Sequence, residues 1–154
     1  MTELRVGVVD VFLVDPSMSG WKVLVLRRAE GTRCTGAWEV VHGRIEEGER
    51  PEFAAEREVR EETGLEVTRI YNVSCHPFYL HRAGVVQIAV VFAAFADSRE
   101  APVLGAEHDC GEWVDYDEAM ARLVWPRSRA ALRDIRALLA DGDAGPVEDV
   151  LRVR

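Results

Sequence analysis

The chain has 154 residues, a length typical of one domain that buries its own hydrophobic core. Its composition, 48% hydrophobic and 30% charged, is that of an ordinary globular protein. The formal net charge of −8 argues against a general affinity for the nucleic-acid backbone or for anionic membranes. An anionic small ligand is still permitted, because one bound cation reverses the field inside a cleft.

The three cysteines, Cys34, Cys75 and Cys110, are an odd number and lack CxxC spacing. This pattern argues against a disulfide framework or a zinc site and favours a reduced setting. The first residues carry acids where a signal peptide needs a basic start, and no apolar run is long enough to span a bilayer. We therefore expect a cytoplasmic protein with a single domain over residues 1–154. Its oligomeric state, monomer or homodimer, stays open.

The predicted elements begin with strands, because the first half of the chain is rich in apolar and β-branched stretches. Strands are expected at Leu4–Val14, Trp21–Ala29 and Ala37–Ile45. A helix is expected at Pro51–Thr63, since proline suits a first helical turn and Gly64 suits the residue after the last.

The second half of the chain predicts a hairpin, a further strand and two helices. The expected ranges are strands at 66–80 and 84–96 joined around His81–Gly84, a strand at 111–115, and helices at 117–124 and 127–140. The residues after about Gly142 are expected to be loosely held. This order of elements predicts an α/β fold with a mixed sheet between helices.

The helix at Pro51–Thr63 carries an unusual cluster of acids. On a helical wheel Glu58, Glu61 and Glu62 share a sector with alanines, on the half expected to pack inward. Arg57 can reach Glu61, but Glu58 and Glu62 are expected to face each other without a cationic partner. Like charges this close destabilise a fold unless a cation joins them. Because oxygen ligands select hard cations, the cluster predicts a site for Mg²⁺ or Mn²⁺, although a solvated charged face is the alternative.

The segment around this helix resembles the signature of the Nudix hydrolases. That signature is glycine, five residues, glutamate, seven residues, and then Arg-Glu-aliphatic-any-Glu-Glu-any-Gly-aliphatic. Here the fixed positions are Gly43, Glu49 and the run Arg57–Leu65, and every one of them matches over 23 residues. The resemblance implies an α/β/α sandwich that hydrolyses a nucleoside diphosphate linked to another moiety.

The resemblance also implies a role for each matching residue. Glu58, Glu61 and Glu62 would form the Mg²⁺ site together with the carbonyl of Gly43. Glu58 is also a candidate general base, with Arg57 orienting it and Glu49 supporting the loop. This agrees with the chemistry, because phosphoanhydride hydrolysis needs neutralised phosphates, an activated water and an acceptor for its proton.

One position before the signature departs from the family pattern. Many members have Pro-Gly-Gly where this chain has Val41-His42-Gly43. The glycine is kept, but the preceding turn must differ. His42 is therefore either a substrate contact or a residue that fills the turn.

The C-terminal third resembles the bacterial dihydroneopterin triphosphate and dATP pyrophosphatases. These carry a Glu-His pair before a Trp-containing strand, and then a tryptophan and an arginine that open the last helix. By this resemblance Glu107 would complete the metal site or act as a base, with Glu112 as its rival. The resemblance favours a nucleoside or pterin triphosphate as substrate.

Several further side chains are candidates for binding the substrate. Arginines suit phosphates because their planar fork forms paired hydrogen bonds, and aromatic rings suit a base or pterin. The cationic candidates are Arg27, Arg28, Arg127 and Arg129, and the aromatic candidates are Trp38, Phe78 and Tyr79. Each has a plain alternative as a solvated or core residue.

Other classes of site are less well supported. No Lys-Ser/Thr follows the glycines at 43 and 48, so the chain lacks a P-loop, and the GxSxG, HExxH and GxGxxG motifs are absent. Two functions remain: an Mg²⁺-dependent pyrophosphohydrolase, or a ligand-binding module of the same fold that has lost turnover. Within the enzyme class, dinucleoside polyphosphates and nucleotide sugars are alternatives to triphosphates, because the signature contacts only the shared pyrophosphate.

Overall fold

The long strand β1 (Glu3–Asp15) runs through the middle of a seven-stranded mixed sheet in a computed structural model that describes residues 1–154. It pairs in parallel with β6 (Val85–Phe95) along almost its whole length, and β6 pairs antiparallel with β5 (Arg69–Leu80). The hairpin predicted around His81–Gly84 is therefore confirmed, with β5 starting three residues later than expected.

The sheet divides between β1 and β2 (Lys22–Arg28), which pair only at two positions, Val14 with Val23 and Asp15 with Lys22. The opening is filled by β3 (Trp38–Glu39), which pairs with β2, and by β4 (Val41–Arg44), which pairs with β1. The prediction of one strand over Ala37–Ile45 was wrong in this respect. The chain breaks at Val40 because it must leave one strand and join the other.

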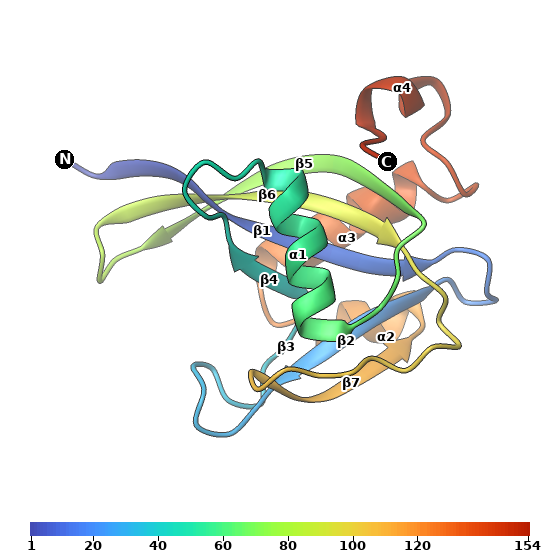
Figure 1. The fold of residues 1–154 in the computed structure, drawn as a ribbon, viewed down its shortest axis with the longest axis horizontal. Helices are drawn as coiled ribbons and strands as arrows, with labels where there is room; N and C mark the ends of the chain where they lie inside the picture. Colours follow the sequence, from blue (N-terminus) through green and yellow to red (C-terminus); the bar gives the residue numbers. More distant parts are fainter.

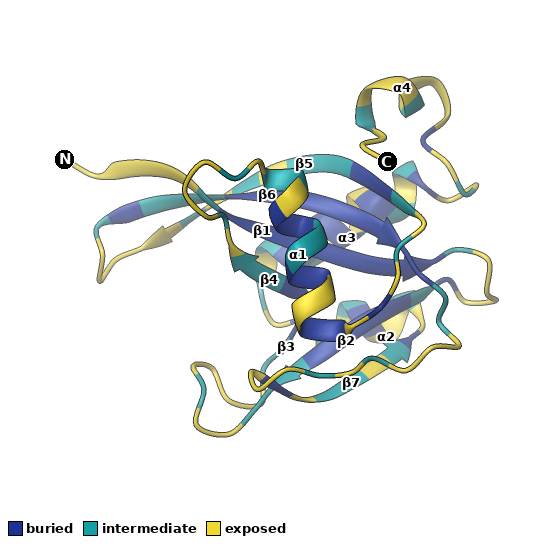
Figure 2. Cartoon of the chain, in the orientation of Figure 1, coloured by how far each residue is buried: buried dark blue, intermediate teal, exposed yellow.

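Helices cover both faces of the sheet. Along β1, Phe12 and Val14 belong to one apolar cluster with residues of helix α3 (Pro126–Leu138). Val11 and Leu13 belong to a second cluster with residues of helix α1 (Pro51–Thr63). Figure 1 shows α1 in front of the sheet, and α2 (Tyr116–Arg122) and α3 behind it. Figure 2 shows that the central strands between these layers are buried. This arrangement confirms the predicted α/β/α sandwich, because β1 is buried on both faces by alternate side chains.

Helix α1 spans Pro51–Thr63, as predicted. Pro51 occupies its first turn, and Gly64 ends it in the left-handed conformation with φ of 65°. The Gly64 N–H donates to the carbonyl of Arg60, which satisfies one of the free carbonyls of the last turn. Both residues used to predict the helix therefore act at its ends.

The later elements follow the predicted order with shifted bounds. Strand β7 (His108–Val114) begins three residues earlier than expected because it pairs with β2 from Val23 to Arg28. Helix α2 (Tyr116–Arg122) and helix α3 (Pro126–Leu138) each start one residue early and end two residues early.

The C-terminal segment, which was expected to be loosely held, contacts β5. After the 3₁₀ turn η1 (Gly145–Val147) and the short helix α4 (Glu148–Leu151), the chain returns to β5. The Val153 N–H donates to the carbonyl of Ile70, and the Ile70 N–H donates to the carbonyl of Arg154. The hydroxyl of buried Tyr71 donates to Glu148 Oε1 at 3.0 Å. None of the helices is long and apolar enough to cross a membrane.

Candidate active site

The acids of helix α1 differ in their surroundings. Glu58 and Glu62 are buried with the apolar side of the helix, whereas the side chain of Glu61 is 59% exposed. The wheel therefore placed Glu58 and Glu62 correctly, and Glu61 lies at the margin of the buried face. That position leaves the Glu61 carboxylate in contact with solvent beside the two buried acids.

Arg57 connects the helix to the preceding loop. Its Nε and Nη2 donate to Glu49 at 3.0 and 2.9 Å, and Nη2 also donates to the Arg44 carbonyl at 2.8 Å. Its Nη1 donates to Glu58 Oε1 at 2.7 Å and to Glu61 Oε2 at 3.5 Å. The expectation that Glu58 lacks a cationic partner was wrong, because Arg57 reaches it from the adjacent position. Arg57 contacts Oε1 of Glu58 and leaves Oε2 free.

Gly43 lies directly beneath Glu58. A Cβ atom at position 43 would be 1.9 Å from the Glu58 carboxyl carbon, a distance that no real side chain tolerates. Gly43 belongs to β4, which pairs with β1, so the backbone cannot move away easily. Only glycine allows the backbone at position 43 to approach the carboxylate this closely.

Glu62 is the buried acid of α1 without a cationic partner. Its Oε2 atom is buried and accepts no hydrogen bond. Burial, together with the negative charges of Glu58, Glu107 and Glu39, raises the pKa of Glu62 to about 9. Burial also raises the pKa of Glu58, although Arg57 opposes this shift.

The acids have the chemistry of a hard-cation site but do not form a finished one. No three His, Cys, Asp or Glu side chains converge on one point. The unpartnered Glu62 oxygen nevertheless lies among three other carboxylates, and a cation is the group that would relieve their repulsion. These residues therefore fit a divalent cation by charge and by donor type.

A second group of charges closes the site from the β2 and β7 side. The carboxylate of buried Glu39 lies 2.9 Å from His108 Nε2 and accepts from Arg28 Nη1 at 3.3 Å. Arg28 Nη1 also lies 3.5 Å from Glu107 Oε2, and this carboxylate is 60% exposed. Arg28 thus connects the buried acid to the surface acid.

The structure separates the two rival acids of the C-terminal third. Glu107 lines the same cavity as Glu58 and Glu62. Glu112 lies outside it, where its carboxylate accepts from Arg122 Nη1 at 2.9 Å. Of the two, only Glu107 is placed to act with the acids of α1.

Asp10 forms a third cluster of charged residues together with His42 and Arg127. It is buried in the middle of β1. Its Oδ1 lies 2.6 Å from His42 Nδ1, and its Oδ2 accepts from Arg127 Nε at 3.0 Å. Burial alone would raise the pKa of Asp10, but His42 and Arg127 hold it below its usual value. The Arg127 guanidinium lies over the ring of Phe78, with Cζ 4.2 Å from the ring centroid.

One cavity of about 900 Å³ is lined by the three acids of α1 and by Gly43, Arg28, Glu39, His42, Glu107 and Arg127. Its other lining residues include Arg33, Arg44, Phe78, Tyr79 and Trp125. Neither Arg33 nor Arg44 has a carboxylate partner, unlike Arg28 and Arg127. The cavity thus combines acids, free cations and aromatic rings, the groups needed for a metal, phosphates and a planar ring.

Three predicted binding residues lie outside this cavity. Arg27 pairs with Asp109 at 2.7 Å. Trp38 packs against the core behind the sheet, with the Arg122 guanidinium 4.8 Å above its ring. Arg129 donates to the carbonyl of Leu123 at 2.8 Å. The sequence showed that these residues are cationic or aromatic. It could not show that each of them already has a partner within the protein.

Five charged residues of the site were not predicted from the sequence: Asp10, Arg33, Glu39, Arg44 and His108. Asp10 and Glu39 did give a signal, because each is an acid inside a stretch that otherwise reads as a buried strand. A buried acid needs a partner, so such an interruption marks a position worth testing. Arg33 and Arg44 lie in a loop and at a strand end, where a cation gives no such signal.

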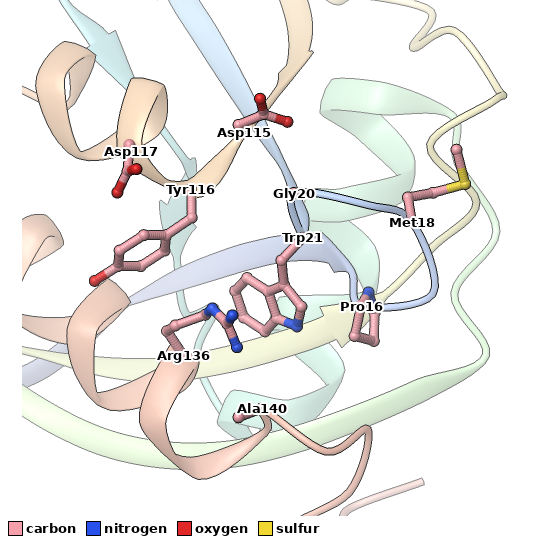
Figure 3. A pocket seen from close by; sticks show the side chains of 9 residues that line it. All are labelled: Pro16, Met18, Gly20, Trp21, Asp115, Tyr116, Asp117, Arg136 and Ala140. Atoms are coloured by element: carbon pink, nitrogen blue, oxygen red, sulfur yellow. The ribbon is translucent and has the colours of Figure 1, made fainter.

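A smaller cavity of about 440 Å³ lies elsewhere, next to Trp21. Figure 3 shows the Arg136 side chain against the Trp21 indole, with Tyr116 and Asp117 nearby, and the guanidinium carbon is 5.1 Å from the ring centroid. None of the acids of α1 lines this cavity. It is therefore separate from the candidate active site.

Comparison with known proteins identifies the family. The model of the NUDIX domain matches residues 4–135. The chain belongs to the Nudix family of hydrolases. A curated relative, an octanoyltransferase of Myxococcus xanthus, is 41% identical over 117 residues, which cover 72% of this chain and 31% of that protein. The chain thus spans less than a third of the length of this relative.

Solved structures of the Nudix fold agree with the architecture. The Ap4A hydrolase of C. elegans has a TM-score of 0.73 and 18% identity, and the match covers 87% of this chain and 97% of that one. The MutT protein of Methanosarcina mazei has a TM-score of 0.71 and 24% identity, and the match covers 88% of this chain and 96% of that one. The dihydroneopterin triphosphate pyrophosphohydrolase of E. coli has a TM-score of 0.67 and 23% identity, and the match covers 86% of this chain and 96% of that one. At these identities the likeness concerns the fold.

Proposed function

We propose that this protein is a Mg²⁺-dependent pyrophosphohydrolase that cleaves a nucleoside or pterin triphosphate into the monophosphate and pyrophosphate. The observation that carries the proposal is the buried Oε2 of Glu62, which accepts no hydrogen bond and lies beside Glu58 in a cavity that also holds two free arginines. Glu58, Glu61 and Glu62 would hold the cation, with the Gly43 carbonyl and Glu107 completing its surroundings. Mn²⁺ is a possible substitute, because it also prefers oxygen ligands.

Each residue contributes a separate part of the reaction. Mg²⁺, when bound, neutralises phosphate charge and makes a water nucleophilic. Glu58 is oriented by Arg57 through Oε1, and its free Oε2 would accept the proton of the attacking water. Glu49 fixes Arg57, and the free guanidinium groups of Arg33 and Arg44 would bind phosphate oxygens.

The choice of triphosphate over other substrates rests on resemblance. The similar structures include an enzyme named for dihydroneopterin triphosphate, an Ap4A hydrolase and a Nudix domain complexed with ADP ribose. Dinucleoside polyphosphates and nucleotide sugars are therefore the alternative substrates. We place the reaction in the cytoplasm, which the three free cysteines support.

A substrate panel tests this proposal. Nucleoside triphosphates, dihydroneopterin triphosphate, diadenosine tetraphosphate and ADP ribose would each be incubated with the protein without a divalent cation, with excess Mg²⁺ and with excess Mn²⁺. We expect release of pyrophosphate from a triphosphate only when the cation is present. If no compound is cleaved with either cation, the protein is a binding module rather than an enzyme.

A further inference from the structure

The side chain of Arg127 is held in one orientation on two sides. Asp10 accepts from its Nε at 3.0 Å, and one face of the guanidinium packs over Phe78. Trp125 adds a second ring, with its centroid 5.4 Å from the guanidinium carbon. Only 15% of the side chain is exposed, so the arginine has little freedom to reorient.

The remaining edge of Arg127 is unused. Its two Nη groups have no acceptor within the protein, and they are absent from the buried atoms that lack partners. They are therefore accessible from the cavity that Arg127 lines. Two parallel N–H donors in one plane suit a ligand that presents two adjacent acceptors in that plane.

The charge of Arg127 decides which acceptors fit. Asp10 is buried against Arg127 and neutralises it, so a phosphate at this point would meet a nearby carboxylate. Arg33 and Arg44 line the same cavity without carboxylate partners and are better placed to attract phosphate. A neutral ring edge is therefore the better ligand for Arg127, and the aromatic residues around it provide surfaces for stacking.

We propose that Arg127, oriented by Asp10, recognises the edge of a 6-oxopurine or 4-oxopterin ring. Both rings present a carbonyl oxygen beside a ring nitrogen, the acceptor pair that arginine binds in guanine through O6 and N7. Adenine presents an amino donor in place of the oxygen, which would face the donors of Arg127. The inference rests on the proposed function, because it assigns the non-phosphate part of the substrate to the same cavity. Asp10 is then a positioning residue.

Binding titrations with Mg²⁺ present test this inference without turnover. The probes are GMP, IMP, AMP and 7-deaza-GMP, which lacks the N7 acceptor. We expect GMP and IMP to bind roughly tenfold or more tightly than AMP, and 7-deaza-GMP to lose much of that advantage. The preference should disappear in Arg127→Met and in Asp10→Asn. It should persist in Arg133→Met, which removes an exposed arginine from the same helix.

The outcomes separate this inference from the proposed function. Equal affinities for GMP and AMP in the wild-type protein, no measurable binding of GMP at millimolar concentration, or a preference that survives in Arg127→Met would overturn it. Equal affinities of the wild-type protein for GMP and 7-deaza-GMP would also overturn the inference, and this comparison holds even if a variant fails to fold. Failure of the proposed function would appear instead in the substrate panel, as the absence of pyrophosphate release. That result does not depend on whether the protein prefers GMP over AMP.

Discussion

At the scale of single residues, Glu58 combines several constraints in one carboxylate. Arg57 contacts its Oε1, Gly43 lies beneath it, and burial raises its pKa. We expect Glu58→Gln to lower kcat by about 10²–10⁴-fold with the fold intact, because the amide can neither accept the proton nor carry the charge. Glu112→Gln removes an acid outside the cavity and should leave kcat nearly unchanged. A Glu58→Gln enzyme with wild-type kcat would show that Glu58 is neither base nor essential ligand.

Glu62 makes the stability of the metal-free protein depend on pH. Its pKa is about 9 in the folded state, above the 4.5 of an ordinary glutamate, so the folded state binds the proton more tightly. Its contribution is therefore fully present below about pH 4.5 and is lost as pH rises toward 9. Between pH 5 and pH 8 this loss amounts to a few kcal/mol, since one pKa unit is worth about 1.4 kcal/mol.

Urea unfolding with a chelator present checks this pH dependence. The free energy of unfolding of the wild-type protein should fall between about pH 5 and pH 8 relative to Glu62→Gln, which cannot ionise. Adding Mg²⁺ should restore part of the loss at the higher pH, because the cation favours the charged carboxylate. Glu66→Gln, at an exposed position, is the matched control. Parallel pH profiles for the wild-type protein and Glu62→Gln would contradict the assigned burial cost.

At the scale of elements, the approach of β4 to α1 brings the backbone of Gly43 against the side chain of Glu58. In Gly43→Ala the new Cβ would overlap Glu58 and displace its carboxylate. We expect kcat to fall at least about tenfold and the free energy of unfolding to fall by about 1–3 kcal/mol. Gly105→Ala is the control, because the nearest atom to its Cβ lies at an ordinary 3.5 Å. Equal kcat values for the two variants would show that this contact does not position Glu58.

The elements also show how far sequence can predict this site. Helix α1 was predicted to the residue because Pro51 and Gly64 impose local backbone preferences at its ends. The break at Val40 could not be predicted, since it depends on β3 and β4 pairing with different strands. Helical periodicity likewise predicted that Glu62 lies on the buried face of α1. It could not predict that Asp10 pairs with Arg127, 117 residues away in the chain. Local signals determine elements, whereas partners depend on the assembled sheet.

At the scale of the whole molecule, the C-terminal segment contacts both β5 and α1. It pairs with β5 at Ile70, covers Tyr71, and carries Arg154, whose Nη1 donates to Glu56 of α1 at 3.0 Å. Because Tyr71 is fully buried, removal of residues 143–154 would expose an apolar surface and leave its hydroxyl without Glu148. Such a deletion should lower the free energy of unfolding by about 2–4 kcal/mol.

A point variant isolates the polar part of this connection. Tyr71→Phe keeps the ring and removes only the hydroxyl, so it should cost about 1 kcal/mol. Tyr79→Phe, at an exposed position, should cost almost nothing. The free energies would be measured by urea unfolding with Mg²⁺ present, so that the site acids do not dominate. Because the segment lies outside the cavity, the deletion variant should keep its kcat at temperatures where it is folded. An unchanged unfolding midpoint after deletion would mean that these contacts add no stability and that the tail is held only weakly.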